Sequence, residues 1–330
     1  MLNPQQKAAV RYIDGPLLVL AGAGSGKTRV ITQKIAYLIE HCGYTANTVC
    51  AVTFTNKAAN EMRARVAAVL PAAKRHGLRV ATFHTLGLSI IKRHVALCDL
   101  KTGFSIFDSE DCLQLLRGFL PVGKANERDY LMQIQQQISR WKNESLSIHE
   151  VYQQDVDPIF ITLYERYQQA LQAYNAVDFD DLILLPVHLL QEHEQIKSVW
   201  QEKIQHLLID EYQDSNLSQY RFVKLLTGER ARFTVVGDDD QSIYAWRGAR
   251  PENLAQLKID YPQLKLIKLE QNYRSTGRIL HVANHLIAHN SHLFEKKLWS
   301  ELGYGEFLRV LCCRDEQDEA EQVIADIISH

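Results

Sequence analysis

A glycine-rich turn near the start of the chain has the residue types and the spacing that hold phosphate. Residues 17–31 read LLVLAGAGSGKTRVI, an apolar run followed by a turn and a helical pattern. The backbone N–H groups of such a turn, together with the N-terminus of the next helix, favour bound phosphate. Lys27 is predicted to reach the β- and γ-phosphates of a nucleotide, and the Thr28 hydroxyl to bind Mg²⁺. The residues predicted to line the phosphate site are Ala21, Gly22, Ala23, Gly24, Ser25, Gly26, Lys27 and Thr28.

The turn departs from the strict phosphate-loop pattern at one position. The pattern G-x-x-x-x-G-K-[ST] begins with a glycine, whereas this chain has Ala21 there. Because Gly22, Gly24 and Gly26 still give the backbone its freedom, the prediction of a phosphate loop stands.

A pair of acidic residues after a later apolar run would complete a hydrolytic site. In HLLIDEYQD, residues 206–214, Asp210 and Glu211 come at the end of a predicted strand. Open α/β sheets bind their ligands at the carboxyl ends of the strands. There, Asp210 can hold Mg²⁺, and Glu211 can orient and deprotonate an attacking water. Paired acids are also common on protein surfaces, but together with the phosphate loop they predict a nucleotide hydrolase.

The segment GDDDQSIYAWRGAR, residues 237–250, combines an amide, two aromatic rings and cations. A neutral amide can donate to phosphate and accept from water, which suits Gln241 for contacting a γ-phosphate or the attacking water. Tyr244 and Trp246 can stack on unpaired bases, with Arg247 as a cation for the nucleic-acid backbone. One short segment would then couple the nucleotide state to the grip on a base. Alternatively, Tyr244 and Trp246, two positions apart, share one face of a strand and belong to the core.

Three consecutive aspartates precede Gln241 and repel one another. Asp238 is predicted to lie near the metal. For Asp239 and Asp240 two alternatives stay open, namely solvation at the surface or an ion pair with Arg247.

The order of the predicted elements indicates an α/β fold with a parallel sheet. Short apolar runs alternate with helical patterns in the first part of the chain and strand-like runs resume near residue 206, as is typical of βαβ units. The predicted strands are 17–20, 49–54, 78–84, 206–210, 232–238 and 264–270. From about residue 86 to 190 the pattern is helical throughout. We therefore predict an α/β domain interrupted by a helical insertion.

The sequence after residue 276 predicts a helix over 277–290, a strand over 307–313 and an acidic helix over 316–330. The last helix runs to the final residue without a cap or a glycine stop. We therefore expect that the chain ends inside a domain and is the N-terminal part of a longer protein.

Composition is that of a globular protein without a membrane segment. Hydrophobic residues make up 46% of the chain, but no stretch approaches about 18 consecutive apolar residues. The six cysteines show no CxxC pair or zinc-ligand spacing, which predicts reduced thiols and a cytoplasmic location. The formal charge of −2 gives no global sign of a nucleic-acid partner. Motifs must therefore decide that question.

Eight motifs in one order resemble those of the UvrD/Rep/PcrA-like DNA helicases of superfamily 1A. They are LNPQQKAAV, AGAGSGKT, AVTFTNKAANEM, ATFHTLGL, DFDDLI, LLIDEYQD, VVGDDDQSIYAWRGA and LEQNYRS. The resemblance implies an ATPase that moves 3′→5′ along single-stranded DNA and displaces the complementary strand in replication or repair. The implied cofactors are ATP and Mg²⁺, and the implied partners are single-stranded DNA, duplex junctions and other replication-fork proteins.

The resemblance also implies a domain organisation. A RecA-like phosphate-loop sheet would form the first motor domain from residues 1–86 and 191–276. Residues 87–190 would be its helical insertion, and residues 277–330 the start of a second RecA-like domain.

Further nucleotide contacts follow from the resemblance. Gln6 would read the adenine edge, with Arg29 and Tyr273 packed on the two faces of the base. Arg274 would approach the γ-phosphate as a cation from the second motor domain. Without the surrounding motif, Tyr273 and Arg274 would be interpreted as an ordinary aromatic residue and a surface cation.

Further DNA contacts follow from it as well. Phe54 would stack on a base, and Thr53, Thr55 and Asn56 would be neutral donors to phosphates. His84 would contact the DNA backbone or, alternatively, is simply packed.

Two other functions stay open. One is a nucleotide-dependent DNA-binding switch that hydrolyses ATP without unwinding, and the other is a phosphate-loop ATPase that acts on protein or another substrate. Since the later motifs of the resembled family lie beyond residue 330, we expect that the 330-residue chain does not unwind duplex DNA.

Overall fold

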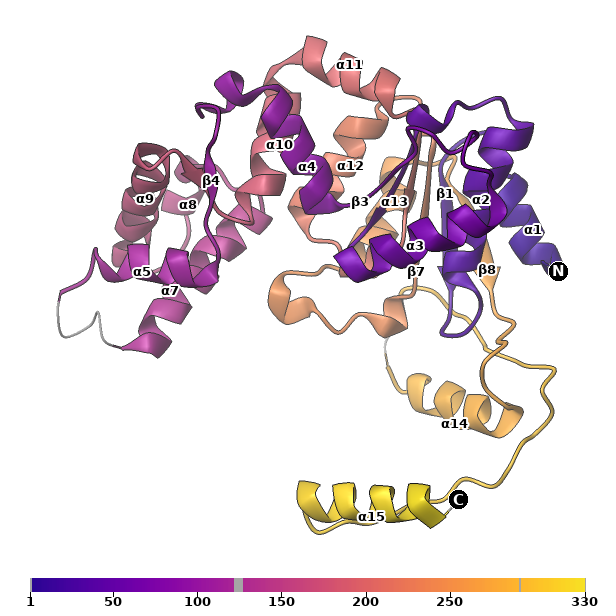
Figure 1. The fold of residues 1–330 in the computed structure, drawn as a ribbon. Coiled ribbons are helices and arrows are strands. Elements are labelled where there is room, and N and C mark those ends of the chain that lie inside the picture. The colour runs from indigo at the N-terminus through magenta and orange to yellow at the C-terminus, as the bar shows by residue number, and fades with distance from the viewer. Residues whose placement is uncertain (1, 122–126, 291, 330) are drawn as a thin grey trace.

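The centre of the molecule is a six-stranded parallel sheet. The structure is a computed structural model that describes residues 2–121, 127–290 and 292–329. The strand order of the sheet is β3-β2-β6-β7-β1-β8, and every neighbouring pair of strands is parallel. The strands are β1 (Leu17–Ala21), β2 (Val49–Thr53), β3 (Arg79–Thr82), β6 (His206–Ile209), β7 (Phe233–Gly237) and β8 (Lys265–Leu269) (Figure 1). The predicted α/β fold is confirmed, since each of these six strands was expected from the sequence.

Helices cover both faces of this sheet. One face carries α1 (Pro4–Arg11), α2 (Lys27–His41) and α3 (Asn56–Val69). The other carries α4 (Phe83–Arg93), α10 (Asp181–Glu192), α11 (Glu194–Lys203), α12 (Leu217–Thr227) and α13 (Glu252–Asp260). Within β1, Leu18 and Leu20 face the second layer, whereas Leu17 and Val19 face the first. Because both faces are covered, the strands are apolar throughout rather than alternating.

A separate core lies in the insertion. The helices α5 (Ser109–Arg117), α7 (Arg128–Asn143), α8 (Ile148–Tyr152) and α9 (Pro158–Ala173) build it around buried residues such as Ile134 and Trp141. The short strands β4 (Ser105–Ile106) and β5 (Ala176–Val177) pair in parallel. The sequence did not predict them, because two-residue strands are too short to show periodicity. The domain boundaries given above, with the insertion at residues 87–190, stay a prediction, although α4 and α10 at its two ends pack on the sheet.

Polar contacts join the insertion to the sheet domain. Asn216 Nδ2 donates to Asn143 Oδ1 at 2.6 Å, and Ser218 Oγ donates to the Lys142 carbonyl at 2.7 Å. Asn216 caps α12 and belongs to the turn that follows the predicted acidic pair. These bonds therefore tie the end of α7 to that turn.

Lys142 at the end of α7 is completely buried and ion-paired. Its Nζ lies 2.7 Å from Asp178 Oδ2 and 2.8 Å from Asp181 Oδ1. The Tyr167 hydroxyl also donates to Asp178 Oδ2, at 2.9 Å. Burial, followed by the charge of Asp178, raises the pKa of Asp181 to about 7. This cluster fastens α7 to the start of α10.

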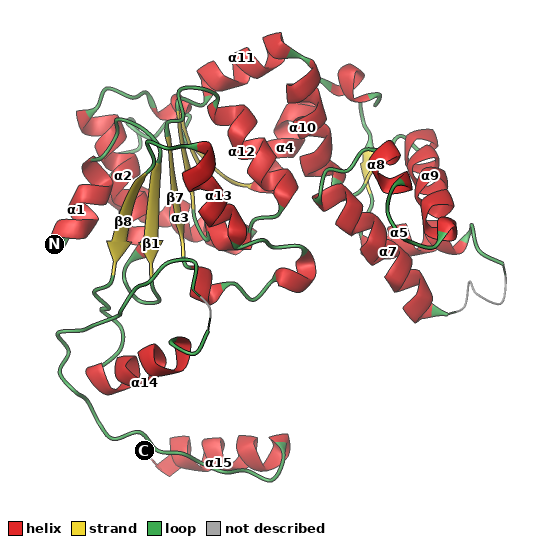
Figure 2. Ribbon diagram, turned by 180° about the vertical axis from the view of Figure 1, so that it is seen from behind, coloured by secondary structure: helices red, strands yellow, loops and turns green. Residues whose placement is uncertain are grey.

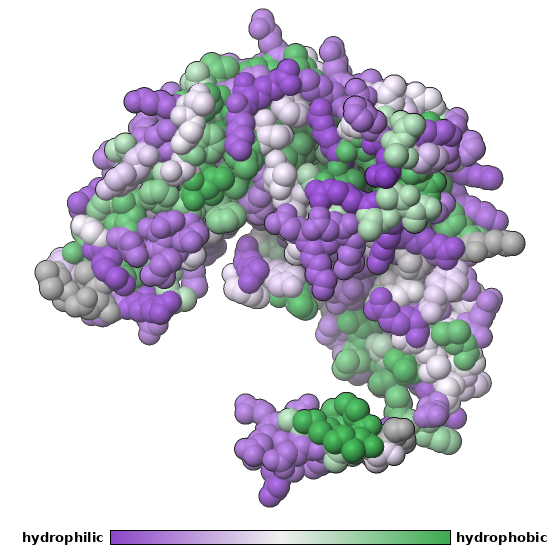
Figure 3. Space-filling model, viewed as in Figure 1, coloured by the Kyte–Doolittle hydropathy of each residue, from purple (hydrophilic) through white to green (hydrophobic). Residues whose placement is uncertain are grey.

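The helices α14 (Gly277–Ile287) and α15 (Glu316–Ser329) lie beyond the carboxyl ends of the strands (Figures 1 and 2). Both were predicted, although residue 330 of the second lies outside the described residues. Each carries an exposed apolar row, formed by Ile279, Val282 and Leu286 on α14 and by Val323, Ile324, Ile327 and Ile328 on α15 (Figure 3). None of the described helices is both long and apolar enough to cross a membrane.

The strand predicted over 307–313 is wrong. These residues adopt no regular secondary structure, and Phe307 and Val310 are 82% and 86% exposed. A strand needs a neighbour with which to exchange backbone hydrogen bonds, and no described segment pairs with this one. The apolar composition alone was therefore misleading.

Candidate active site and nucleic-acid interface

The carboxyl ends of the strands bring the predicted site residues to one edge of the sheet. β1 leads into the phosphate loop, β6 into Asp210 and β7 into the turn that contains Gln241. Because the pairing is parallel throughout, these ends lie at the same edge, where open α/β sheets bind ligands. Segments that are far apart in the sequence therefore meet there.

The phosphate loop forms without a glycine at its first position. Ala21 is the last residue of β1, pairs in register with Leu269 and is fully buried. Its backbone does not have a positive φ, so the alanine costs the loop nothing. Gly24 does have a positive φ of 70°, and a Cβ there would lie only 2.7 Å from Asn272 Nδ2. That amide donates to the Ala23 carbonyl at 2.6 Å, so the loop is held from the β8 side.

Lys27 lies where two other predicted site residues meet. Its Nζ is 2.7 Å from Glu211 Oε2 and 3.2 Å from Gln241 Oε1. The side chain of Lys27 is 10% exposed and that of Glu211 is 41% exposed, so the pair borders solvent. This position at the border of the solvent suits the predicted phosphate contact of Lys27, which stays a prediction.

The side-chain oxygens of Thr28 and Asp210, which were predicted to hold Mg²⁺, lie close together. Thr28 Oγ1 donates to Asp210 Oδ2 at 3.3 Å, and the Glu211 N–H donates to Asp210 Oδ1 at 3.1 Å. Burial, followed by the charge of Glu211, raises the pKa of Asp210 to about 6. A hydroxyl and a carboxylate are hard oxygen ligands that fit Mg²⁺. A bound cation would also relieve the repulsion between the two carboxylates.

Gln213 connects the turns after β6 and β7. Its Nε2 donates to Glu211 Oε2 and its Oε1 accepts from the Asp238 N–H, each at 3.0 Å. The side chain is almost fully buried. Gln213 therefore fixes Glu211 relative to the turn that carries Gln241.

The three residues predicted to contact adenine lie near the phosphate loop. Gln6 is buried, with Nε2 donating to the Ser25 carbonyl at 2.9 Å and Oε1 accepting from the Asn3 N–H at 3.1 Å. Asn3 Nδ2 also donates to the Tyr273 hydroxyl at 2.9 Å. Arg29 is exposed on α2. Asn3 thus links Gln6 to Tyr273, and the adenine contacts of all three residues stay predictions.

Arg274 is placed beside the phosphate loop by Asn272. Asn272 Oδ1 accepts from the N–H groups of Arg274 and Ser275, at 2.8 Å and 2.7 Å. The Arg274 Cβ would lie 2.9 Å from a Cβ at Gly24. Its guanidinium forms no hydrogen bond or ion pair with any described residue. This position suits the role predicted at the γ-phosphate, which stays a prediction.

Tyr244 and Trp246 lie in an exposed turn, where they are 40% and 73% exposed. The alternative that they are core residues is therefore wrong. The Arg247 guanidinium carbon lies 4.5 Å from the ring centre of Trp246 and 5.6 Å from that of Tyr244. A Cβ at Gly248 would lie 3.8 Å from Asn143 Cβ, so the turn approaches the insertion. The interaction of the two rings with DNA stays a prediction.

The predicted DNA contacts after β2 differ in exposure. Thr55 and Asn56 are exposed at the start of α3, where Thr55 caps the helix. Thr53 is buried, and its hydroxyl donates to the Thr55 carbonyl at 3.1 Å. Phe54 is half-buried, with its ring centre 5.3 Å from that of Phe83. Thr55 and Asn56 are thus accessible, and the DNA roles of all four residues stay predictions.

His84 is half-buried and lies 6.1 Å from the Phe179 ring, measured between ring centres. Burial lowers the pKa of His84, so its neutral imidazole can offer a hydrogen bond but not a charge. Phe179 is 52% exposed and belongs to the DFDDLI motif. No role was predicted for this aromatic face from the sequence.

Comparison with known proteins identifies the family. The family model of the UvrD/REP helicase N-terminal domain matches residues 2–262, and that of the UvrD-like helicase C-terminal domain matches residues 267–330. The chain belongs to the UvrD/Rep helicase family. The resemblance seen in the sequence is thereby confirmed, and so is the RecA-like fold, given the parallel sheet.

Similar members of this family are ATP-dependent DNA helicases by name. Over its whole length the chain is 56% identical to the ATP-dependent DNA helicase Rep of Escherichia coli (strain K12) and 54% identical to that of Salmonella typhimurium. It is 38% identical to the ATP-dependent DNA helicase PcrA of Staphylococcus epidermidis. These matches cover 49%, 49% and 46% of the three relatives. The chain therefore spans about half the length of the curated relatives that it matches.

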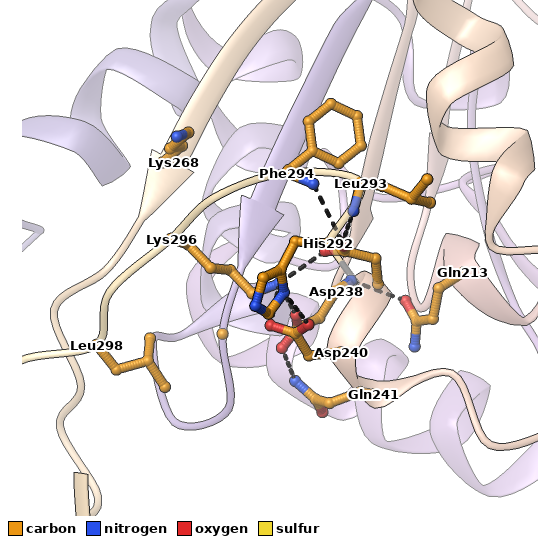
Figure 4. Close-up of polar contacts among 12 residues, drawn as sticks. Gln213, Asp238, Asp240, Gln241, Lys268, His292, Leu293, Phe294, Lys296 and Leu298 are labelled. Atoms are coloured by element: carbon orange, nitrogen blue, oxygen red, sulfur yellow. Dashed lines mark hydrogen bonds and ion pairs between the residues drawn. The ribbon is translucent and has the colours of Figure 1, made fainter. Parts of the chain in front are cut away.

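Both alternatives for Asp239 and Asp240 in this UvrD/Rep-family chain are wrong. The Lys296 Nζ lies 2.6 Å, 2.7 Å and 2.6 Å from carboxylate oxygens of Asp238, Asp239 and Asp240 (Figure 4). The side chains of Asp239 and Asp240 are only 5% and 14% exposed, and Arg247 stacks on an aromatic ring instead. The three carboxylates lie close enough to hold a cation, but the Lys296 ammonium already contacts all three.

Sequence reasoning missed three residues that organise this UvrD/Rep-family site. Gln213 and Asn272 stand inside motifs quoted above, but an amide in a motif does not reveal which partner it bonds. Lys296 follows in a stretch, EKKLWS, that carries no motif. A buried run of three aspartates needs a nearby cation, and that requirement was the one signal available.

We expect Asp210→Asn to stabilise the nucleotide-free chain, because removal of a buried charge outweighs the loss of one of the two hydrogen bonds that Asp210 accepts from Thr28 and the Glu211 N–H. The pKa of Asp210 is raised from 3.8 to about 6, and one unit corresponds to about 1.36 kcal/mol, so the free energy of unfolding should rise by up to about 3 kcal/mol. A carboxyl whose pKa is raised in the folded state does not change the free energy of unfolding below its unfolded pKa. As the pH rises from 3.8 to about 6, it lowers the free energy of unfolding progressively. The gain should therefore appear at about pH 8 and vanish at about pH 4 in urea unfolding.

The matched control is Asp155→Asn, which changes an exposed aspartate of the insertion. It should give no gain at either pH. A gain for Asp210→Asn that does not depend on pH would contradict the burial of a charged carboxylate.

Proposed function

We propose that this chain hydrolyses ATP and uses it to move 3′→5′ on single-stranded DNA, as an ATP-dependent DNA helicase of replication or repair. One observation carries this proposal: Lys27, Glu211 and Gln241 converge from three strands at one sheet edge. Tyr244 follows Gln241 by three residues in an exposed turn. The names of the relatives, which are ATP-dependent DNA helicases, support it further.

The nucleotide site would work through positioned charges. The backbone of the phosphate loop and Lys27 would bind the phosphates. Thr28 and Asp210 would hold Mg²⁺, which neutralises phosphate charge when bound. Glu211 would orient a water molecule and take its proton. Arg274 would add a cation at the γ-phosphate.

The DNA site would depend on stacking and on neutral donors. The rings of Tyr244 and Trp246 offer exposed faces for unpaired bases, and Arg247 offers charge for the backbone. Thr55 and Asn56 would donate to phosphates. Gln241 would sense the γ-phosphate and pass its state to the aromatic turn, because only two residues separate it from Tyr244.

The proposal also includes the binding partners of the chain and its location in the cell. Single-stranded DNA and duplex junctions would be the partners, together with other replication-fork proteins. The six free thiols support a cytoplasmic location.

The test is ATP hydrolysis with Mg²⁺, in the presence and absence of oligo-dT. Stimulation by oligo-dT supports the proposal over a phosphate-loop ATPase that acts on protein. A rate of ATP hydrolysis that is the same with and without oligo-dT would favour an ATPase that acts on protein. Strand displacement measured on a tailed duplex separates a helicase from a DNA-binding switch that hydrolyses ATP without unwinding.

Trp246→Ala should weaken single-stranded DNA binding by about 5-fold to 150-fold, because one stacked base contributes about 1–3 kcal/mol. Fluorescence anisotropy with labelled oligo-dT measures this effect, and DNA-stimulated turnover should fall with it. Tyr174→Ala is the matched control, since Tyr174 is an exposed ring on the insertion. Unchanged DNA stimulation in Trp246→Ala would show that the turn does not couple DNA to the nucleotide.

A further inference from the structure

A segment outside the strand-end motifs contacts both loops that face the nucleotide site. At one end, Lys296 reaches the aspartates that follow β7 (Figure 4). Two residues later, Leu298 lies against the phosphate loop, where a Cβ at Gly22 would come within 2.3 Å of its methyl carbon. We call residues 292–298 the strap; residue 291 before it lies outside the described residues. The strap therefore bridges the phosphate loop and the turn of Gln241.

The backbone of the strap is fixed to the same turn. The N–H groups of Leu293 and Phe294 donate to Asp239 Oδ2, at 3.2 Å and 3.3 Å. His292 Nδ1 lies 3.1 Å from Asp240 Oδ1. Several groups of the strap thus converge on these carboxylates, and Lys296 is the one that meets all three aspartates.

The positive charge of Lys296 offsets the repulsion among the three aspartates. Three adjacent carboxylates on one turn repel one another, more strongly where water is excluded. The Lys296 side chain is only 6% exposed. Burial alone lowers its pKa, but the contacts with the carboxylates of Asp238, Asp239 and Asp240 outweigh burial and raise the pKa. The ammonium therefore stays charged and balances part of the negative charge.

Asp238 contacts both Lys296 and Gln241, one with each carboxylate oxygen. One carboxylate oxygen, Oδ1, lies 2.6 Å from Lys296 Nζ. The other, Oδ2, accepts a hydrogen bond from Gln241 Nε2. That bond turns Gln241 Oε1 toward Lys27, at 3.2 Å. A continuous chain of polar contacts thus runs from the strap to the phosphate-binding lysine.

We propose that Lys296 is a positioning residue for nucleotide recognition: by holding Asp238, it fixes the Gln241 amide so that it distinguishes ATP from ADP. This inference rests on the proposed function, since it assumes that Gln241 meets the γ-phosphate. Lys296 itself touches no nucleotide. As a result, the affinity of the Gln241 amide for the γ-phosphate depends on whether the strap contacts the aspartates.

Lys296→Met tests the inference, because methionine keeps the length and apolar stem of the side chain but removes the charge. Affinities for fluorescent mant-ATPγS and mant-ADP are measured on the 330-residue chain with Mg²⁺. We expect the preference for the triphosphate to fall about tenfold, as for loss of a charge-assisted hydrogen bond. Lys297→Met is the matched control, since the neighbouring Lys297 is exposed and should leave the preference unchanged.

A double-variant cycle with Gln241→Ala separates positioning from simple docking. If Lys296 acts through Gln241, the double variant loses no more preference than Gln241→Ala alone. Equal weakening of both nucleotides, or additive losses, would overturn the inference. If Lys296→Met does not fold, Asp238→Ala removes the residue that joins Lys296 to Gln241, and an unchanged preference in that variant also overturns the inference. A parent chain that binds neither nucleotide would instead overturn the proposed function.

Discussion

Lys27→Ala is expected to reduce ATP hydrolysis by at least about 100-fold, which is the usual cost of removing a donor that stabilises transition-state charge. The Lys27 ammonium is the cation that meets both Glu211 and Gln241. In the proposed function, the developing charge on the γ-phosphate would then lose the cation that the phosphate loop supplies. Single-turnover hydrolysis, with and without oligo-dT, measures the loss.

The matched control for this prediction is Lys101→Ala, which removes an exposed lysine of the insertion and should leave turnover unchanged. Circular dichroism of both variants checks the fold. Undiminished turnover in Lys27→Ala would remove the assignment of the phosphate loop.

Lys142→Met is expected to lower the free energy of unfolding by about 3–5 kcal/mol, because it leaves buried carboxylates without their cation. Asp178 and Asp181 both lie within 2.8 Å of Lys142 Nζ. The loss should be smaller at about pH 5.5 than at about pH 8. The pKa of Asp181 is raised to about 7, so protonation at the lower pH removes the repulsion between the two carboxylates. Urea unfolding at both pH values measures this difference.

The same helix offers a control. Arg140 pairs with Glu144 one turn away, and its side chain is 68% exposed. Since exposed pairs contribute little, Arg140→Met should unfold at nearly the same urea concentration as the parent. A comparable loss in the two variants would mean that the ion pairs of Lys142 add nothing beyond ordinary packing.

The strands and the order of the motifs were predictable from the sequence because local patterns determine them. The run LLVL and the turn after it define β1 and the phosphate loop, whichever residues lie elsewhere. Parallel topology then places Asp210 and Gln241 at the same edge. For these parts, spacing and residue type were sufficient.

The features that could not be predicted from the sequence depend on contacts between segments that are far apart in the chain. Nothing in the run of aspartates names Lys296 as their partner, because the pairing arises only once residues 292–298 fold back on the turn. The strand predicted over 307–313 failed for the related reason that a strand is defined by its neighbour. Likewise, Lys142 sits in an ordinary amphipathic pattern, and only the fold reveals its burial.

The bond between Asn216 and Asn143 limits how the insertion can be exchanged. A chimaera that receives the insertion of another protein without a matching acceptor would leave the amide of Asn216 unsatisfied, five residues after Glu211. Grafted modules would therefore disturb turnover even where they never touch nucleotide. For protein engineers, the exchangeable unit includes the end of α7 together with the capping turn of α12.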